Sequence, residues 1–349
     1  MKRWIAYVTC LAVLALSCGA WAFEVEIVKW GFIDKTGEFV IEPQFGEVRD
    51  FSDGLAWVRK EIGGRVSFVN AKGEVALKTG YTDVGDFREG LAHVWIDGGR
   101  CGYMDKTGEL VIRPQFSEAW WFCEGLARVK VGGWSGKYGY IDKTGKLVVE
   151  ATFEGANVFS EGLAAVEIDG TYGYIDKTGE YVVEPKFEWA RDFSQGLAAV
   201  RVGGKMGFID TSGKMVIGPQ YKAVGDFSED LAAFKRDRKW GYINKTGEVV
   251  IQDTLGMGKA QRFTEGRAPA SRGLDYGYID TGGNFVIKAE GFTVFADFHE
   301  GLARIFVMAK LVFIDTAGKR VIETKFKDGG DFHEGLARAA IVEGKVEAE

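Results

Sequence analysis

The sequence has 349 residues and a formal net charge of −6, with 46% apolar and 27% charged residues. This balance is that of an ordinary soluble globular protein. An acidic chain without a basic stripe does not bind phosphate backbones through counterion release, so nucleic acid and anionic membrane surfaces are not expected partners. The 49 glycines and 13% aromatic residues, with only 5 prolines, favour many short strands joined by tight turns.

The first 22 residues have the pattern of a secretory signal peptide. Lys2 and Arg3 precede an uncharged, mostly apolar run over residues 4–16, and residues 20–22 (Ala-Trp-Ala) supply the small-x-small pattern that signal peptidase needs. The run is short for a permanent membrane anchor. We expect cleavage after Ala22, export to the periplasm or cell surface, and a mature domain of residues 23–349 without a transmembrane segment. Lipidation at Cys18, or an uncleaved anchor helix, is the alternative.

The rest of the chain repeats one motif nine times. The copies start at Trp30, Val66, Cys101, Tyr138, Tyr172, Met206, Trp240, Tyr276 and Leu311, at intervals of 34 to 37 residues. A period in this range indicates stacked supersecondary units, none of which buries its apolar surface alone.

Each copy is predicted to form three antiparallel strands, as the copy at residues 172–205 illustrates. Its first strand ends at Asp176, and a type I turn with Gly179 at positive φ leads into the second strand. A loop of about ten residues then ends in Phe193, which we expect to plug the core, before the third strand starts. The first two strands are apolar on both faces, which predicts that both faces are covered.

Two motifs carry a resemblance to a known family. The pair Trp-Gly at residues 30–31 and 240–241, and Gly-Tyr-Ile-Asp-Lys-Thr-Gly at residues 139–145 and 173–179, resemble the WG (KWG) repeat family of mostly bacterial proteins. The resemblance covers residues 30–345. It implies an all-β array used for interaction and supplies no set of catalytic residues. The seventh repeat departs from the pattern, and Pro269 inside its third strand predicts an irregular unit.

The predicted fold is therefore all-β, a tandem array of nine three-stranded antiparallel repeats of about 35 residues. Propellers usually have four to eight blades, and nine copies exceed that number. We therefore favour an open, curved β-stack or solenoid, with a closed propeller-like ring as the alternative. Residues 24–29 supply an extra strand at the start, and residues 336–342 are left as a cap or closing strand.

The sequence shows no constellation of residues for catalysis, metal binding or cofactor binding. It contains no Asp-x-Asp pair, and the cysteines after residue 22 form no CxxC motif. His299 and His333 occupy a turn position where other copies have serine. Cys101 and Cys123 are equally consistent with a disulfide in an oxidising compartment and with two unrelated small residues.

Aromatic residues replace charged or small ones in the first three repeats. They occupy strand positions predicted to face outward, or loop positions: Trp57, His93, Trp95, Trp120 and Trp121. Aromatic rings at such positions mark recognition more often than packing. The sequence predicts that these residues lie near one another on a solvent-facing surface and bind sugar rings or apolar peptide side chains.

These patterns predict an exported, non-catalytic repeat scaffold that binds a protein or polysaccharide of the cell envelope. The alternative is a carbohydrate- or peptidoglycan-active enzyme with acidic residues at one end of the array. That enzyme would need two carboxyl groups about 5–10 Å apart in a deep cleft.

Overall fold

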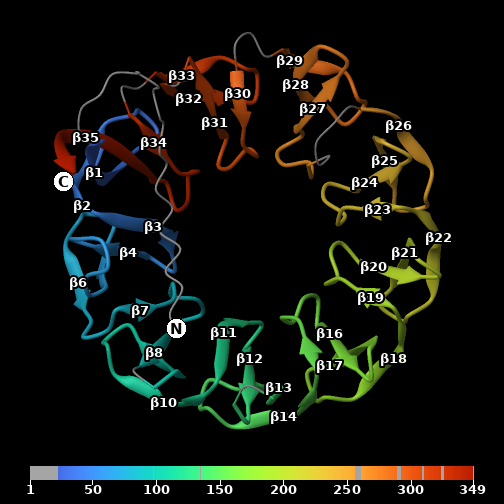
Figure 1. Ribbon diagram of the computed structural model, residues 1–349. Coiled ribbons are helices and arrows are strands. Elements are labelled where there is room, and N and C mark those ends of the chain that lie inside the picture. The colour runs from blue at the N-terminus through green and yellow to red at the C-terminus, as the bar shows by residue number, and fades with distance from the viewer. Residues whose placement is uncertain are drawn as a thin grey trace, which may run out of the picture.

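The computed structural model describes residues 23–96, 98–133, 135–255, 261–288, 292–308, 310–323 and 326–348. The regular structure of these residues is β-strand throughout, and the strands form nine small antiparallel sheets set as blades around a ring (Figure 1). The expectation of nine all-β repeats is confirmed. In the described part of the chain, no helix has the length and apolar character needed to cross a membrane.

The blades are numbered along the ring, and their strands are given from the inner to the outer edge. Blade 1 contains β34 (Asp328–Gly329), β35 (Ala337–Ala348), β1 (Phe23–Ile33) and β2 (Phe39–Phe45). Blade 2 contains β3 (Glu47–Ser52), β4 (Leu55–Arg59), β5 (Ser67–Val69) and β6 (Val75–Lys78). Blade 3 contains β7 (Asp83–Val84), β8 (Leu91–Ile96), β9 (Arg100–Asp105) and β10 (Leu110–Phe116). Blade 4 contains β11 (Glu118–Cys123), β12 (Leu126–Val131), β13 (Lys137–Ile141) and β14 (Leu147–Phe153).

The second half of the ring repeats this order. Blade 5 contains β15 (Gly155–Ala156), β16 (Leu163–Ile168), β17 (Thr171–Asp176) and β18 (Tyr181–Phe187). Blade 6 contains β19 (Trp189–Ala190), β20 (Leu197–Val202), β21 (Lys205–Asp210) and β22 (Met215–Tyr221). Blade 7 contains β23 (Ala223–Val224), β24 (Leu231–Arg236), β25 (Lys239–Asn244) and β26 (Val249–Leu255). Blade 8 contains β27 (Ala268–Arg272), β28 (Asp275–Ile279) and β29 (Phe285–Lys288), and blade 9 contains β30 (Phe292–Phe295), β31 (Leu302–Val307), β32 (Lys310–Asp315) and β33 (Arg320–Glu323).

A blade is thus out of phase with the sequence repeat. Each repeat supplies the third and outer strands of one blade and the inner and second strands of the next. The inner strand lies in the segment that the sequence pattern predicted to be loop. In blades 1, 3, 5, 6 and 7 it has only two residues. Blade 8 is the irregular unit: its described residues form three strands, and Pro269 stands in β27, where it has no N–H to donate.

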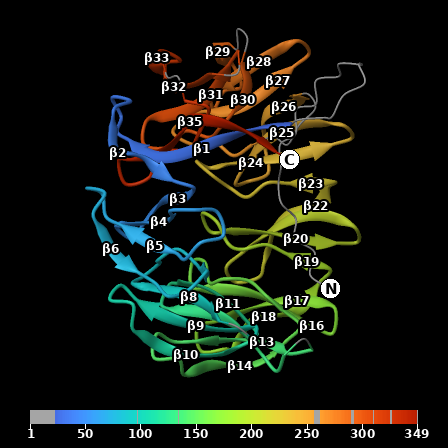
Figure 2. The ribbon, with the colours of Figure 1, turned by 60° about the vertical axis from the view of Figure 1, so that its left-hand side comes forward.

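The ring is closed, so the preference for an open stack is wrong. The N-terminal strand β1 pairs with the C-terminal strand β35 from Phe23 opposite Ala348 to Ile33 opposite Ala337. Blade 1 therefore takes two strands from each end of the chain, which lie side by side in Figure 2. Of the residues left over at 336–342, all but Leu336 belong to this closing strand. Closure makes the structure a nine-bladed β-propeller.

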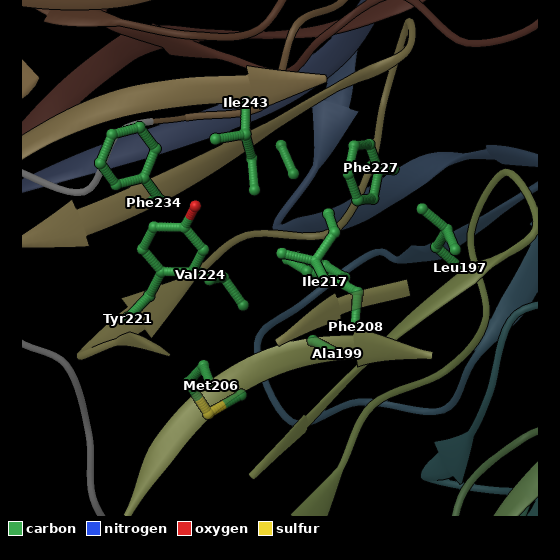
Figure 3. Close-up of a cluster of buried hydrophobic side chains, with 11 residues drawn as sticks. Leu197, Ala199, Met206, Phe208, Ile217, Tyr221, Val224, Phe227, Phe234 and Ile243 are labelled. Carbon is green, nitrogen blue, oxygen red and sulfur yellow. The ribbon is translucent and has the colours of Figure 1, made fainter. Parts of the chain in front are cut away.

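The hydrophobic core lies between the blades. The described residues form nine buried clusters, and each one joins two neighbouring blades. In the cluster of Figure 3, Phe227 of blade 7 meets Phe208 of blade 6 edge to face, with ring centroids 4.8 Å apart. The same aromatic pair recurs at every interface, which confirms that the predicted plug phenylalanines pack into the core.

The glycine of the Trp-Gly motif is explained by a close approach between the third and outer strands. A Cβ on Gly173 would lie 2.5 Å from the carbonyl oxygen of Val183. The outer strand itself differs from expectation, because it is not covered on both sides. Val183 is buried, whereas Tyr181 and Val182 are exposed, since nothing in the ring lies outside this strand.

One face of the ring, the turn face, carries the turns between inner and second strands. The residue at the tip of each turn has φ between 51° and 58° and accepts a hydrogen bond from the backbone N–H of the next blade's turn. Glu161, for example, accepts from Gly196 at 2.8 Å. The other acceptors are Asp53, Glu89, Glu124, Gln195, Glu229, Glu265, Glu300 and Glu334. We call these contacts turn latches. The opposite, hairpin face carries the hairpins between second and third strands.

Candidate functional site

The five residues predicted as a ligand site lie on three consecutive blades. Trp57 is on β4, His93 and Trp95 are on β8, and Trp120 and Trp121 are on β11. Trp57 is only 4% exposed, so the expectation that it faces solvent is wrong. It packs between blades 2 and 3, because both faces of a blade are covered by neighbours. The other four side chains are half-buried.

Two of these tryptophans form matching pairs with arginine. In blade 2 the guanidinium of Arg49 on β3 lies 4.6 Å from the ring centre of Trp57 on β4. In blade 4 the two residue types exchange strands. The guanidinium of Arg128 on the second strand, β12, lies 3.8 Å from the ring centre of Trp120 on the inner strand, β11. Blades 2 and 4 also have six-residue inner strands with a register irregularity before the turn. Cation–π contact therefore covers ring surface that was expected to be free.

His93 and Trp95 are also held by packing. The imidazole of His93 fills the space beside Gly85, where a Cβ would lie 2.0 Å from Cε1. Burial lowers the pKa of His93, and the charges of Asp83 and Arg49 act on it in opposite directions. Trp95 packs against the cluster between blades 3 and 4.

Trp121 replaces one half of an ion pair that other blades have. At its position five other blades have an aspartate that pairs with an arginine of the preceding blade, as Asp226 pairs with Arg191 at 2.9 Å. In blade 4 the guanidinium of Arg88, from blade 3, lies 4.7 Å from the ring of Trp121 instead. The structure thus brings the predicted residues onto adjacent blades, but it does not align them as one exposed aromatic row.

A cleft of about 310 Å³ is lined by one residue of blade 1 and five of blade 2, and it includes one of the predicted residues. It is lined by Trp30, Glu47, Val48, Arg49, Trp57 and Arg59. Trp30 pairs with Phe45 at the end of β2, where the chain turns into β3, so the cleft lies toward the hairpin face. We call this the arginine–tryptophan cleft. Its volume is at the lower end of the range for small-ligand sites, and three of its six lining residues are charged.

The polar groups of the cleft are only partly satisfied. Arg59 donates from Nη1 to Glu47 Oε2 at 2.7 Å and from Nη2 to the carbonyl of Thr82. Its Nε and the indole Nε1 of Trp57 are buried and have no hydrogen-bond partner in the described structure. Both atoms are buried out of contact with solvent, so a ligand in the cleft does not reach them while the side chains keep these positions.

Of the six cleft residues, only Trp57 was among the predicted site residues. Trp30 was read as the start of the repeat, and Arg49 and Arg59 served only as the charged residues that aromatic ones replace elsewhere. The signal that could have found one pair is spacing. Arg49 precedes Trp57, and Trp120 precedes Arg128, by the same eight positions.

The cysteines and histidines take structural positions. Cys101 and Cys123 are free thiols, which decides against a disulfide between them. His299 and His333 occupy equivalent turns of blades 9 and 1, with ring centroids 5.3 Å apart. In the part of the chain that the structure describes, no three His, Cys, Asp or Glu residues are grouped so that they could hold a metal ion.

The closed ring and the single repeated motif define the class: a nine-bladed β-propeller made of homologous blades. The family model described as WG containing repeat matches residues 30–61, 67–98, 102–133, 138–172, 172–205, 206–240, 240–253, 276–307 and 313–345. These matches span most of the sequence, and the chain belongs to the WG-repeat family, as its motifs predicted. A comparison with curated proteins finds no match.

The chain is similar to several solved structures at low sequence identity. One, described as the eukaryotic initiation factor, is 11% identical with a TM-score of 0.61, over 89% of this chain and 97% of that one. BamB from Moraxella catarrhalis is 12% identical with a TM-score of 0.46, over 84% and 95%. Virginiamycin B lyase from Staphylococcus aureus is 11% identical with a TM-score of 0.37, over 90% and 99%. The first likeness supports the fold alone.

Proposed function

We propose that the protein is an exported, non-catalytic scaffold that binds a protein or carbohydrate of the cell envelope. The observation that carries this proposal is the arginine–tryptophan cleft, whose lining includes two indole rings and two guanidinium groups. Such a site has aromatic area for contact and directional donors for specificity. Among the five predicted residues, Trp57 contributes to it directly. His93, Trp95, Trp120 and Trp121 remain predicted ligand contacts on the neighbouring blades.

A scaffold role is supported by what the repeated acidic residues do. The carboxylates at the turn tips accept backbone N–H groups of the next blade, and several also bind its lysine, as Glu89 binds Lys143 at 3.1 Å. These acids stabilise contacts between blades. A hydrolase would instead need a pair of carboxyl groups presented to substrate.

Export is supported by the sequence of residues 1–22, which lie outside the described residues. N-terminal sequencing of the protein recovered from the periplasm or medium is expected to begin at Phe23. A lipid-modified start at Cys18 would point to a lipoprotein, and an intact Met1 in the cytosol would refute export.

Binding is tested by retention of cell-envelope material on immobilised protein of residues 23–349. Material should be retained by the unmodified protein and lost with Arg59→Ser. Arg201→Ser is the matched control, because Arg201 occupies the equivalent position of blade 6, where it is exposed. Protease treatment of the extract should abolish retention of a protein ligand, and periodate treatment that of a carbohydrate. Equal retention by all three proteins would refute a role for the cleft.

A further inference from the structure

The residue before each turn-latch acceptor reaches across to the next blade. At this position Ser160 of blade 5 donates from Oγ to the carbonyl of Phe193 at 2.8 Å, and Ser194 of blade 6 donates to the carbonyl of Phe227 at 2.7 Å. The serines at this position in blades 2 and 7 make the same contact. Phe193 immediately precedes Ser194, so the side chain at this position lies next to the equivalent position of the following blade.

Blades 9 and 1 have histidine at this position, in His299 and His333. The two imidazoles lie side by side across the interface between these blades, with ring centroids 5.3 Å apart and planes tilted by 40°. Both side chains are half-buried, and neither imidazole has a hydrogen-bond or ion-pair partner among the described residues. A neutral imidazole has one nitrogen with a free lone pair, so the interface holds two unused metal-ligand atoms.

The separation of the two rings is that of a pair of histidines on one metal ion. A tetrahedral ion held at about 2.0–2.1 Å from one nitrogen of each imidazole sets the two ring centres about 5 Å apart. Rings that coordinate one ion are inclined and not stacked face to face, and the 40° tilt of this pair meets that condition. The turn latches fix both backbones, so the adjustment that directs a nitrogen of each ring at one ion is confined to side-chain rotation.

The carboxylates beside the histidines are already engaged. Glu300 accepts from the backbone N–H of Gly335 at 3.1 Å and pairs with Lys35 at 3.1 Å. Glu334 accepts from the backbone N–H of Gly54 at 3.0 Å. Two imidazoles without a carboxylate suit Zn²⁺ or Cu²⁺, whereas Ca²⁺ and Mg²⁺ prefer oxygen ligands.

From these contacts we propose that His299 and His333 together bind one divalent transition-metal ion, Zn²⁺ or Cu²⁺. The ion joins the turn between β30 and β31 to the turn between β34 and β35, across the interface at which blade 9 meets the blade that closes the ring. Two protein ligands leave the other coordination positions to water, where a further ligand can enter. The site lies on the turn face, whereas the arginine–tryptophan cleft lies toward the hairpin face, so the inference goes beyond the proposed function and does not depend on it.

The test is isothermal titration of tag-free protein of residues 23–349 with zinc chloride. One equivalent is expected to bind, and an excess of Ca²⁺ or Mg²⁺ should not displace it. His299→Ser and His333→Ser place the residue of blades 2, 5, 6 and 7 at each position, so both variants should fold. Each should weaken Zn²⁺ binding by about a hundredfold, because binding to two linked imidazoles becomes binding to one. Arg88→Ser, the same replacement at the equivalent position of blade 3, should leave affinity unchanged.

Two further measurements separate a metal site from a packed pair of rings. Saturating Zn²⁺ should raise the midpoint of thermal unfolding of the unmodified protein and of Arg88→Ser, but not of either histidine variant. The electron paramagnetic resonance spectrum of one equivalent of bound Cu²⁺ should show coupling to two nitrogen atoms, a readout that needs no variant. Failure of both ions to bind, unchanged Zn²⁺ affinity in either histidine variant, or Cu²⁺ coupled to fewer than two nitrogens would overturn the proposal. The two rings would then be a structural contact between blades.

Discussion

The carboxylate of Glu334 accepts the backbone N–H of Gly54 at 3.0 Å, across 280 positions of the sequence. This turn latch joins blade 1 to blade 2 and completes a circle of nine equivalent contacts in the described structure. The acceptor residue has a φ of 54°, a conformation that costs free energy in residues other than glycine. The hydrogen bond of the turn latch offsets that cost at the interface between blades 1 and 2, as it does at every other interface.

Replacing Glu334 with alanine should lower the free energy of unfolding by about 1 kcal/mol, because the latch is lost while the backbone cost at positive φ stays the same. Urea unfolding measures the change. Glu334→Gln is the matched variant, since Gln195 makes the same contact with an amide oxygen at 2.9 Å. The glutamine should retain most of the stability. A glutamine variant as unstable as the alanine variant would show that charge, and not the hydrogen bond, matters.

The sequence predicted the repeat units but not how they close. Nine copies, the turn glycines and the plug phenylalanines all follow from local pattern. Closure depends on the pairing of Phe23–Ile33 with Ala337–Ala348, a contact between opposite ends of the chain. The sequence pattern predicted a strand at each end of the chain, but periodicity does not encode the angle between neighbouring blades. A two-residue inner strand such as Gly155–Ala156 is too short for an alternating pattern to reveal it.

The exposure predicted for Trp57 is wrong, and ligand binding by the other four predicted residues stays a prediction. Alternation along residues 55–59 gave one buried and one outward face, as in a sheet with a single covered side. In a propeller both faces of a blade are covered, so Trp57 is core. The partners of the tryptophans could not be predicted from alternation, because Arg49 and Arg128 lie on a neighbouring strand of the blade.

Trp57 should contribute more than Trp121 to the free energy of unfolding, because Trp57 is buried and Trp121 is half-buried. Trp57→Ala should lower the free energy of unfolding by about 3–5 kcal/mol, because it empties a site that is 4% exposed. Trp121→Ala should cost about 0.5–1 kcal/mol, mainly the contact with Arg88. Denaturant unfolding of both variants compares them directly. Similar costs for the two would contradict the packing described for Trp57.

The two free thiols should differ in reactivity. Burial raises the pKa of Cys101 to about 12, so almost no thiolate is present at pH 8. Cys123 is half-buried and donates from Sγ to the carbonyl of Phe159 at 3.2 Å. In native protein, iodoacetamide should therefore modify Cys123 first and Cys101 only after unfolding, as mass spectrometry of digests would show. A non-reduced peptide that links the two cysteines would contradict the structure.

Asp192 is an acid at a position where the equivalent residues have an arginine partner. Asp226 pairs with Arg191 at 2.9 Å, but the blade before Asp192 offers Asn157 at the position of that arginine. The Oδ1 atom of Asp192 is buried and has no partner in the described residues. Burial raises the pKa of Asp192, the negative charge of Asp226 adds to the effect, and Asn157 opposes it.

A carboxyl group with a raised pKa in the folded state favours the protonated form there. The stability that it contributes is present below the unfolded pKa of about 3.9 and is lost as pH rises through the folded pKa. The substitution Asp192→Asn removes the ionisable group, and with it the loss of stability as pH rises. The variant should match the unmodified protein in stability below about pH 4 and exceed it by about 1 kcal/mol at neutral pH. Thermal unfolding across that pH range measures the difference.

The control for Asp192 is the same substitution one blade further on. Asp226→Asn breaks the ion pair with Arg191, whose side chains are 38% and 49% exposed, and removes no buried unsatisfied charge. It should therefore leave neutral-pH stability unchanged or slightly lower. If Asp192→Asn also lowers stability at neutral pH, the carboxylate has a partner that stabilises its charge. The conclusion that blade 5 offers this acid no ion-pair partner would then be wrong.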